Sequence, residues 1–187
     1  MQLYIKNMVC NRCKMVVKAE LEKLGFNPIS VQLGEVKIEQ ENLSEEKKEG
    51  LKLALNKFGF ELLTEKKEQL VEQVKTAIIE LVHYSKEMLK LNLSHYLSEK
   101  LGVEYASLSA TFSEHEHQTI EKYFIAQKIE KVKELLTYGE KSLSEIAYEL
   151  NYSSVAHLSN QFKKVIGETP TAYKLSKNTN RKTLNEV

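Results

Sequence analysis

Apolar residues recur along the chain with two different periods, and the period changes near residue 64. Before that point, runs in which apolar and polar residues alternate predict short strands, and runs with apolar residues three or four positions apart predict helices. After it, the apolar residues keep helical spacing to about residue 175. The sequence therefore predicts an α+β protein, in which a mixed N-terminal domain is followed by an all-α domain.

The first 64 residues carry the elements of one small sheet. The alternating runs lie at 2–8, 29–33, 36–39 and 60–63, and the helical runs lie at 13–24 and 44–57. Gly34 and Glu35 indicate a hairpin, and Gly25 and Gly59 indicate the ends of the helices. The predicted order is β-α-β-β-α-β, which is the ferredoxin-like arrangement.

A long amphipathic helix is predicted over residues 65–91, where no glycine or proline interrupts the apolar stripe. The stripe consists of Leu70, Val74, Ile78, Leu81, Met88 and Leu89. We expect residues 65–75 to form a helical linker and the later half to open the second domain. The same stripe also fits a coiled-coil seam, so a homodimer through this helix or through the N-terminal domain stays open.

Two helix-turn-helix units are predicted after this helix, at 92–117 and 142–174, joined by a helix over 118–137. The same order of residue types recurs in both units, as Leu97, Gly102, Leu108, Phe112 and then Ile146, Asn151, Leu158, Phe162. The predicted domains are therefore 1–64, a linker at 65–75, a double helix-turn-helix domain at 76–176 and a loose tail at 177–187.

The second helix of the second unit has one apolar and one polar side. The apolar stripe consists of Val155, Leu158, Phe162 and Val165. The other side carries Ser153, Ala156, His157, Asn160, Lys163 and Lys164. Asn151 lies at the turn, where we expect a left-handed backbone that Asn tolerates well. A helix that buries one side and presents amides, hydroxyls and lysines on the other suits the major groove of DNA.

This stretch resembles the second helix-turn-helix of AraC/XylS-type transcription regulators, whose ending runs approximately I-A…G-F-s…F-s-r-x-F-K-k-x-x-G-x-t-P-x-x-Y-R. The matching residues are Ile146-Ala147, Tyr152, Leu158-Ser159-Asn160, Phe162-Lys163-Lys164, Gly167, Thr169-Pro170 and Tyr173-Lys174. The chain departs at Asn151, Leu158 and Asn160, where the family has Gly, Phe and Arg. The resemblance covers residues 75–175 and implies binding to double-stranded DNA.

The resemblance also implies unequal roles for the two units. The expected DNA-binding residues are Ser109 of the first unit and Ser153, Ala156, Ser159, Asn160, Lys163 and Lys164 of the second. In the first unit, Ala106, Ser109 and Ala110 would offer only one hydroxyl and two methyl groups, and the nearby glutamates would repel phosphates. The amide of Asn160 can pair with adenine, so we expect most base readout from the second unit. His157 is open to two interpretations, a turn-facing residue or a direct DNA contact.

A second motif, Met8-Val9-Cys10-Asn11-Arg12-Cys13, places two thiols at a predicted strand-to-helix loop. The helix N-terminus and Arg12 would favour thiolates there. The motif resembles the Met-x-Cys-x-x-Cys of the heavy-metal-associated domain, although Asn7 and Val9 replace its Gly and Thr. The resemblance implies a soft-metal site at Cys10 and Cys13, with Cu(I) favoured over Hg(II) or Zn(II). The alternative is a pair of partly buried thiols without a ligand.

Composition narrows the classes of protein that fit. Of the 187 residues, 42% are hydrophobic, enough for packed cores, and no apolar run is long enough to span a bilayer. There is no pattern typical of a signal peptide, and the two cysteines cannot form a disulfide framework, so we expect a cytoplasmic protein. The chain has no Asp and no Gly-rich phosphate loop, and we therefore expect no enzyme activity.

Together these patterns predict a sequence-specific DNA-binding transcription regulator, whose N-terminal domain senses a soft metal or another ligand. The alternative function is a metallochaperone-like carrier of a soft metal, whose helical domain binds a protein partner.

Overall fold

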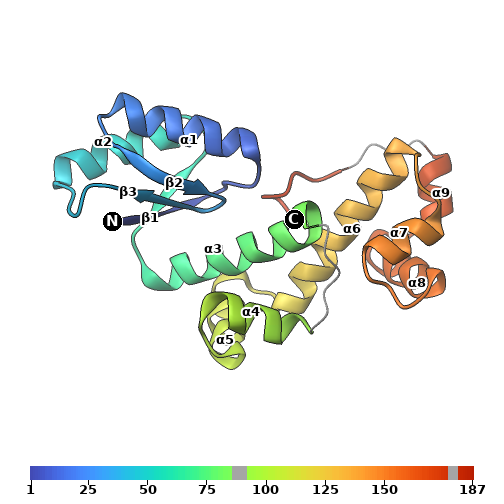
Figure 1. Cartoon of the computed structure of the whole chain (residues 1–187). Helices are drawn as coiled ribbons and strands as arrows, with labels where there is room; N and C mark the ends of the chain where they lie inside the picture. The colour runs from blue at the N-terminus through green and yellow to red at the C-terminus, as the bar shows by residue number, and fades with distance from the viewer. Residues whose placement is uncertain (86–91, 177–180) are drawn as a thin grey trace. The chain divides into compact units, whose positions relative to one another are not determined.

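The computed structural model describes residues 1–85, 92–176 and 181–187. They form two compact units, Met1–Thr76 and Ala77–Val187 (Figure 1). The first contains a small sheet with helices, and the second is helical over its described residues, which confirms the predicted combination of a mixed and an all-α part. None of the helices in the described ranges is long and apolar enough to cross a membrane.

The first unit builds a small antiparallel sheet. Its elements are β1 (Gln2–Lys6), α1 (Asn11–Lys23), β2 (Pro28–Gln32), β3 (Glu35–Ile38), α2 (Glu45–Asn56) and β4 (Glu61–Leu63). The strands lie in the order β2-β3-β1-β4, and all three pairings are antiparallel. Alternation sets which side is buried: Leu3 pairs with Val36 and Ile5 with Leu62, and all four contribute to the core under α1 and α2.

The helix α3 (Lys66–Ile79) follows the other face of the sheet (Figure 1). Gln69 Nε2 donates a hydrogen bond to the carbonyl of Leu63 at 3.0 Å. Gly34 lies against Thr76, and a Cβ on Gly34 would come within 2.6 Å of Thr76 Oγ1. Because Gly34 also has a φ of +71°, both its backbone conformation and this close approach require glycine.

A π-helical turn, η1 (Glu80–Tyr84), continues α3, and Ser85 after it is extended. The helix predicted over residues 65–91 is thus present from Lys66 to Tyr84, and its expected residues Met88 and Leu89 lie outside the described residues. Val74 and Ile78 of the predicted apolar stripe are almost completely buried in this chain.

The second unit contains both predicted helix-turn-helix motifs. Its helices are α4 (Leu93–Leu101), α5 (Tyr105–Glu116), α6 (Ile120–Tyr138), α7 (Leu143–Glu149), α8 (Val155–Ile166) and α9 (Pro170–Leu175). The pairs α4–α5 and α7–α8 are the two motifs, and α6 joins them (Figure 1). Side chains that accept a backbone N–H mark the starts of all these helices except α5, namely Asn92, Thr119, Ser142, Ser154 and Thr169.

The turns of the two motifs differ in length. Gly102 and Asn151 both have a left-handed backbone, with φ of +66° and +56°, as predicted for Asn151. Glu104 is the N-cap of α5, two positions after Gly102, whereas Ser154 is the N-cap of α8, three positions after Asn151. The predicted repeat therefore holds for the helices, and the second turn is one residue longer than the first.

Residues 181–187 contact α6, which differs from the loose tail expected at 177–187. Arg181 Nη2 lies 3.0 Å from Glu134 Oε2, and the N–H of Lys182 donates to Glu130 Oε2 at 3.1 Å. Gln127, which is fully buried in α6, donates from Nε2 to the carbonyl of Leu184 at 3.0 Å. Residues 181–187, which are mostly polar and have no periodic pattern, thus lie against α6 because this helix offers them polar hydrogen-bond partners.

Candidate nucleic-acid interface

The helix α8 buries one side against the rest of the second motif. Leu158 and Phe162 are completely buried, and the ring of Phe162 meets that of Tyr173 edge-on, with centroids 5.5 Å apart. Val165, predicted to belong to this stripe, is 47% exposed, so that prediction is wrong. Ile166 takes its place, because it continues the four-residue spacing of Leu158 and Phe162 and packs on their cluster.

The opposite side of α8 and the residue positions before it face outward. The exposed residues are Ser153, Ala156, His157, Asn160, Lys163 and Lys164, and Ser159 is half-buried. Apart from Ser109, which lies on α5, these are the residues expected to bind DNA, together with His157, and they lie on the outward side of α8 or, for Ser153, just before its N-cap. An exposed amide, two lysines and small side chains give this surface donors, acceptors and positive charge without bulk.

The N-terminal turn of α8 is tied together by hydrogen bonds. Ser154 Oγ accepts the backbone N–H of His157 at 3.1 Å, and Ser153 Oγ lies 3.0 Å from Nδ1 of the same histidine. The ring of Tyr152 meets the His157 ring edge-on, with centroids 5.3 Å apart and an interplanar angle of 86°. The hydroxyl of Tyr152 donates to Gln161 Oε1 at 2.7 Å. The start of the helix is therefore held in one arrangement.

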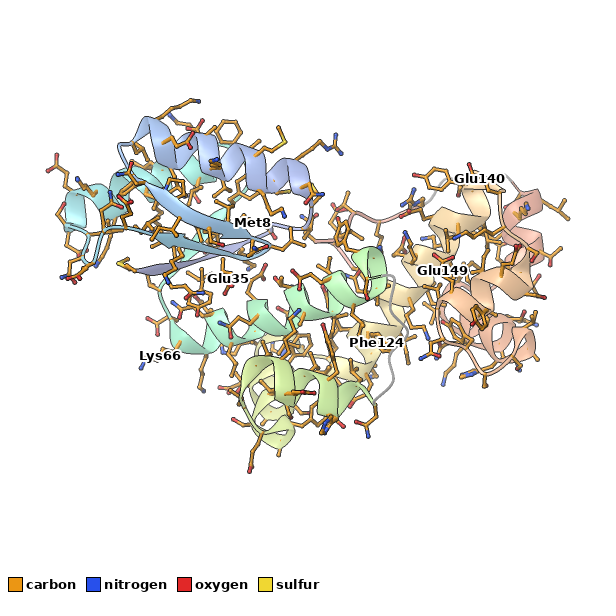
Figure 2. The ribbon with its side chains drawn as sticks, viewed as in Figure 1. Met8, Glu35, Lys66, Phe124, Glu140 and Glu149 are labelled. Atoms are coloured by element: carbon orange, nitrogen blue, oxygen red, sulfur yellow. The ribbon has the colours of Figure 1, made fainter. Side chains whose placement is uncertain are left out.

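Lys128 of α6 extends this arrangement, and sequence reasoning did not identify it. Its Nζ lies 3.7 Å from the centre of the Tyr152 ring and 5.5 Å from that of Phe124, a neighbour on α6 that is labelled in Figure 2. Burial lowers the pKa of Lys128 to about 8. The electron-rich faces of aromatic rings attract a cation, so the ammonium group holds the turn before α8 against α6. The four-residue spacing of Phe124 and Lys128 was the available signal in the sequence.

The corresponding surface of the first motif is poorer in polar groups. Ala106 and Ala110 of α5 are exposed and Ser109 is half-buried. These three side chains offer one hydroxyl and two methyl groups. Tyr105 donates a hydrogen bond to Glu121, and this bond holds the pKa of Glu121 below its usual value. The described face of α5 therefore offers fewer donors to a nucleic acid than α8 does.

The two cysteines of the first unit lie side by side. Cys10 is the N-cap of α1, and the Sγ atoms of Cys10 and Cys13 are 3.1 Å apart. Burial opposes ionisation, but hydrogen bonds from Cys13 and from the N–H groups of Cys13 and Arg12 lower the pKa of Cys10. Burial and the contact with Cys10 raise the pKa of Cys13.

Further ligands are scarce around this pair. Met8 is 1% exposed and belongs to the core of the first unit, so its sulfur is committed to packing. Within the described ranges, no three or more His, Cys, Asp or Glu side chains gather as a metal-binding group. The structure thus brings the two predicted thiols together without a third ligand of this kind.

Known proteins resemble the second unit. A family model described as a helix-turn-helix domain matches residues 97–176. The xylose operon regulatory protein of Escherichia coli (strain K12) is 27% identical over 99 residues, which are 52% of this chain and 25% of that protein. The chain thus spans about a quarter of the length of the curated relatives it matches.

Two solved structures are similar to the C-terminal part of the chain. The C-terminal domain of AraT, a response regulator from Geobacillus stearothermophilus, is 25% identical with a TM-score of 0.51, over 60% of this chain and 88% of that one. A transcriptional regulator from Chromobacterium violaceum, described as containing an AraC-type DNA-binding domain, is 18% identical with a TM-score of 0.49, over 58% and 94% of the two chains. Residues 97–176 therefore form a helix-turn-helix domain that is similar to the DNA-binding domains of AraC-type transcription regulators.

Proposed function

We propose that the whole chain is a transcription regulator that binds double-stranded DNA sequence-specifically, with α8 giving most of the base readout. The observation that carries this proposal is the exposed side of α8. Its polar and small residues lie opposite the fully buried Leu158 and Phe162, at the helix that enters the major groove in helix-turn-helix proteins.

The residues on the outward side of α8 and just before it suit different DNA contacts. The amide of Asn160 can form two hydrogen bonds to adenine, and the methyl group of Ala156 can contact that of thymine. Ser153 and Ser159 supply hydroxyls for bases or phosphates, and Lys163 and Lys164 supply charge for phosphates. Affinity would thus come mainly from phosphate contacts and specificity from a few groups on one helix. We assign no catalytic role to these residues.

A selection of binding sites from random duplexes with the full chain tests this function. We expect one sequence motif to be enriched. Its base preferences should stay the same at higher salt, although the higher salt weakens binding to all duplexes. Enrichment of no motif at either salt concentration would contradict sequence-specific recognition. Enrichment in which Ser109 and its neighbours on α5 set most base preferences would contradict the dominant role of α8.

The N-terminal unit would serve as a regulatory domain of ferredoxin-like fold at residues 1–64. The alternation of strands and helices in the order β-α-β-β-α-β, with the strand order β2-β3-β1-β4, supports this assignment. We propose that residues 65–75 link it to a DNA-binding domain at 76–176. The helix α3, which covers this stretch from Lys66 onward, begins in the first compact unit and ends in the second.

A soft metal ion is the ligand that the N-terminal unit fits best. Two sulfur atoms 3.1 Å apart at the start of a helix can approach one ion, and two thiolates suit Cu(I), which accepts low coordination numbers. Cys10 and Cys13 would hold the ion, and Met8 would support the loop from the core. The competing function, a metallochaperone-like carrier whose helical domain binds a protein, shares this site but requires no DNA binding.

Competition for Cu(I) with a chromogenic chelator under reducing conditions tests the metal site. The chain should hold one ion, and Cys10→Ser or Cys13→Ser should each abolish tight binding, because one thiolate cannot retain the ion. Met15→Ala, which removes a sulfur that is 71% exposed and outside the pair, is the matched control and should bind as the wild type does. No retention of copper by the wild type would contradict the site.

A further inference from the structure

His157 is an exposed side chain that the fold nevertheless holds in place. Its ring meets the ring of Tyr152 edge-on and its Nδ1 lies 3.0 Å from Ser153 Oγ. Tyr152 is in turn fixed by its hydrogen bond to Gln161 and by the Lys128 ammonium group on its face. An exposed histidine at the start of a helix ordinarily samples several rotamers, and this one has neighbours on two sides that select one orientation.

The position of His157 on α8 is that of a DNA-facing residue. It precedes Asn160 by three residues, so the two share one side of the helix, and Ser153, just before the N-cap, lies beside its ring. It also belongs to the first turn of α8, because Ser154 is the N-cap. In helix-turn-helix proteins the N-terminal residues of the second helix contact base edges.

The chemistry of the ring leaves one atom for a ligand. When the Ser153 hydroxyl donates to Nδ1, that nitrogen is the acceptor of the neutral ring and Nε2 carries the hydrogen. Nε2 is then a donor, and the matching groups in the major groove are the N7 and O6 acceptors of guanine. Fixing the ring before binding reduces the entropic cost of binding and makes the interaction dependent on direction.

We propose that His157 is a further specificity-determining residue, whose Nε2–H donates to guanine at a base pair next to the one read by Asn160. This inference rests on the proposed DNA-binding function and deepens it. Ser153 and Tyr152 act as positioning residues, because they orient the ring. The proposal distinguishes His157 from Lys163 and Lys164, which contribute charge and carry no information about sequence.

The test measures dissociation constants for a panel of duplexes in which each base pair of the selected site is varied. His157→Ala should lower discrimination at one G·C pair by about tenfold or more and leave the other pairs discriminated as before. For the wild type, 7-deazaguanine at that pair should cause a similar loss, and for His157→Ala it should cause little further loss. His157→Gln, which keeps a donor, should restore part of the discrimination.

Two further variants separate positioning from a merely structural effect. Ser153→Ala should lower discrimination at the same base pair, and Ser153→Thr, which keeps the hydroxyl, should retain it. His95→Ala on α4, whose side chain is 61% exposed, is the matched control and should leave the whole profile unchanged. Melting temperatures close to that of the wild type would show that the variants still fold, as expected for exposed residues.

Three outcomes would overturn the proposal. An unchanged profile for His157→Ala would remove the residue as a reader of bases. A uniform loss at all base pairs, with a salt slope lowered by about one, would make His157 a phosphate contact instead. A wild-type chain that binds every duplex alike would remove the proposed function itself, so the two failures are distinguishable.

Discussion

Asn160 lies on the exposed side of α8, opposite the buried Leu158 and Phe162. Asn160→Ala should relax specificity at one base pair and cost roughly 1–3 kcal/mol of discrimination there, because alanine cannot form the two hydrogen bonds of the amide. Dissociation constants for the single-base variants of the selected site check this. The same preferences in the variant and the wild type would remove Asn160 as a reader.

Lys163 and Lys164 lie one turn beyond Asn160 and are exposed. Replacing both with Ala should weaken binding to specific and random duplexes alike and lower the salt slope by about one for each phosphate that is no longer neutralised. The double variant Lys52→Ala with Lys57→Ala changes net charge equally at exposed positions of the first unit and should leave the slope nearly unchanged. Equal slopes for the α8 variant and the wild type would place its lysines away from phosphates.

Lys128 gives the second unit a pH dependence that can be worked out from its environment. Burial lowers the pKa of Lys128 to about 8, below the ordinary 10.5, so between these values the unfolded chain binds more protons than the folded one. Its contribution therefore makes the free energy of unfolding rise with pH in this window, by at most about 1.4 kcal/mol per pH unit.

The comparison of wild type with Lys128→Met isolates this contribution. Urea unfolding followed by circular dichroism at pH 7.5, just below the window from about 8 to 10.5, and at pH 8.5 and 9.5 within it, should show a smaller rise in stability for the variant. The attraction between the ammonium group and the face of the Tyr152 ring should contribute mainly at pH 7.5, because the folded-state lysine loses its charge above a pKa of about 8. Parallel curves would show that Lys128 keeps an ordinary pKa.

For single residues, the sequence pattern predicts which side chains are buried or exposed better than it predicts which residues contact one another. Exposure of Asn160 and burial of Phe162 follow from the helical period alone. The contact of Lys128 with Tyr152 joins residues far apart in the chain, so it depends on how α6 meets the second motif. Val165 and Ile166 are adjacent, and periodicity alone does not decide between neighbours at the edge of a stripe.

The element whose packing matters most for the interface is α8. Phe162→Ala removes a completely buried ring that contacts Tyr173, and it should cost roughly 3–5 kcal/mol and loosen the second motif. Val165→Ala, at an exposed position of the same helix, should change stability by less than about 0.5 kcal/mol. Thermal melting checks both, and similar losses for the two variants would mean that the buried side of α8 is wrongly assigned.

The starts of helices and the turns are predictable from the sequence, because the residues that form them are close together in the chain. Ser44 caps α2 by accepting the N–H of Lys47, and Ser142 forms a capping box with Glu145 on α7. The turn at Asn151 followed from the tolerance of Asn for a left-handed backbone. The π-helical turn at Glu80–Tyr84 leaves no comparable signal, since its residues also fit an ordinary α-helix.

At the scale of the whole molecule, the proposed metal and DNA sites should be linked if the N-terminal unit is a sensor. Loading Cys10 and Cys13 with Cu(I) should then change DNA affinity by some factor, and DNA should change copper affinity by the same factor. Fluorescence anisotropy of labelled duplex with the apo and loaded chain, together with chelator competition with and without duplex, checks this. Copper binding that leaves DNA affinity unchanged would keep the metal site and remove the sensor role.

The central claim is that this chain reads DNA sequence mainly through α8. The most direct measurement is the ratio of dissociation constants for a scrambled and a selected duplex, for the wild type, Asn160→Ala and Ser109→Ala. We expect a wild-type ratio of about 10³ or more, a clear fall for Asn160→Ala and little change for Ser109→Ala. A wild-type ratio near one, or a larger fall for Ser109→Ala than for Asn160→Ala, would contradict the account.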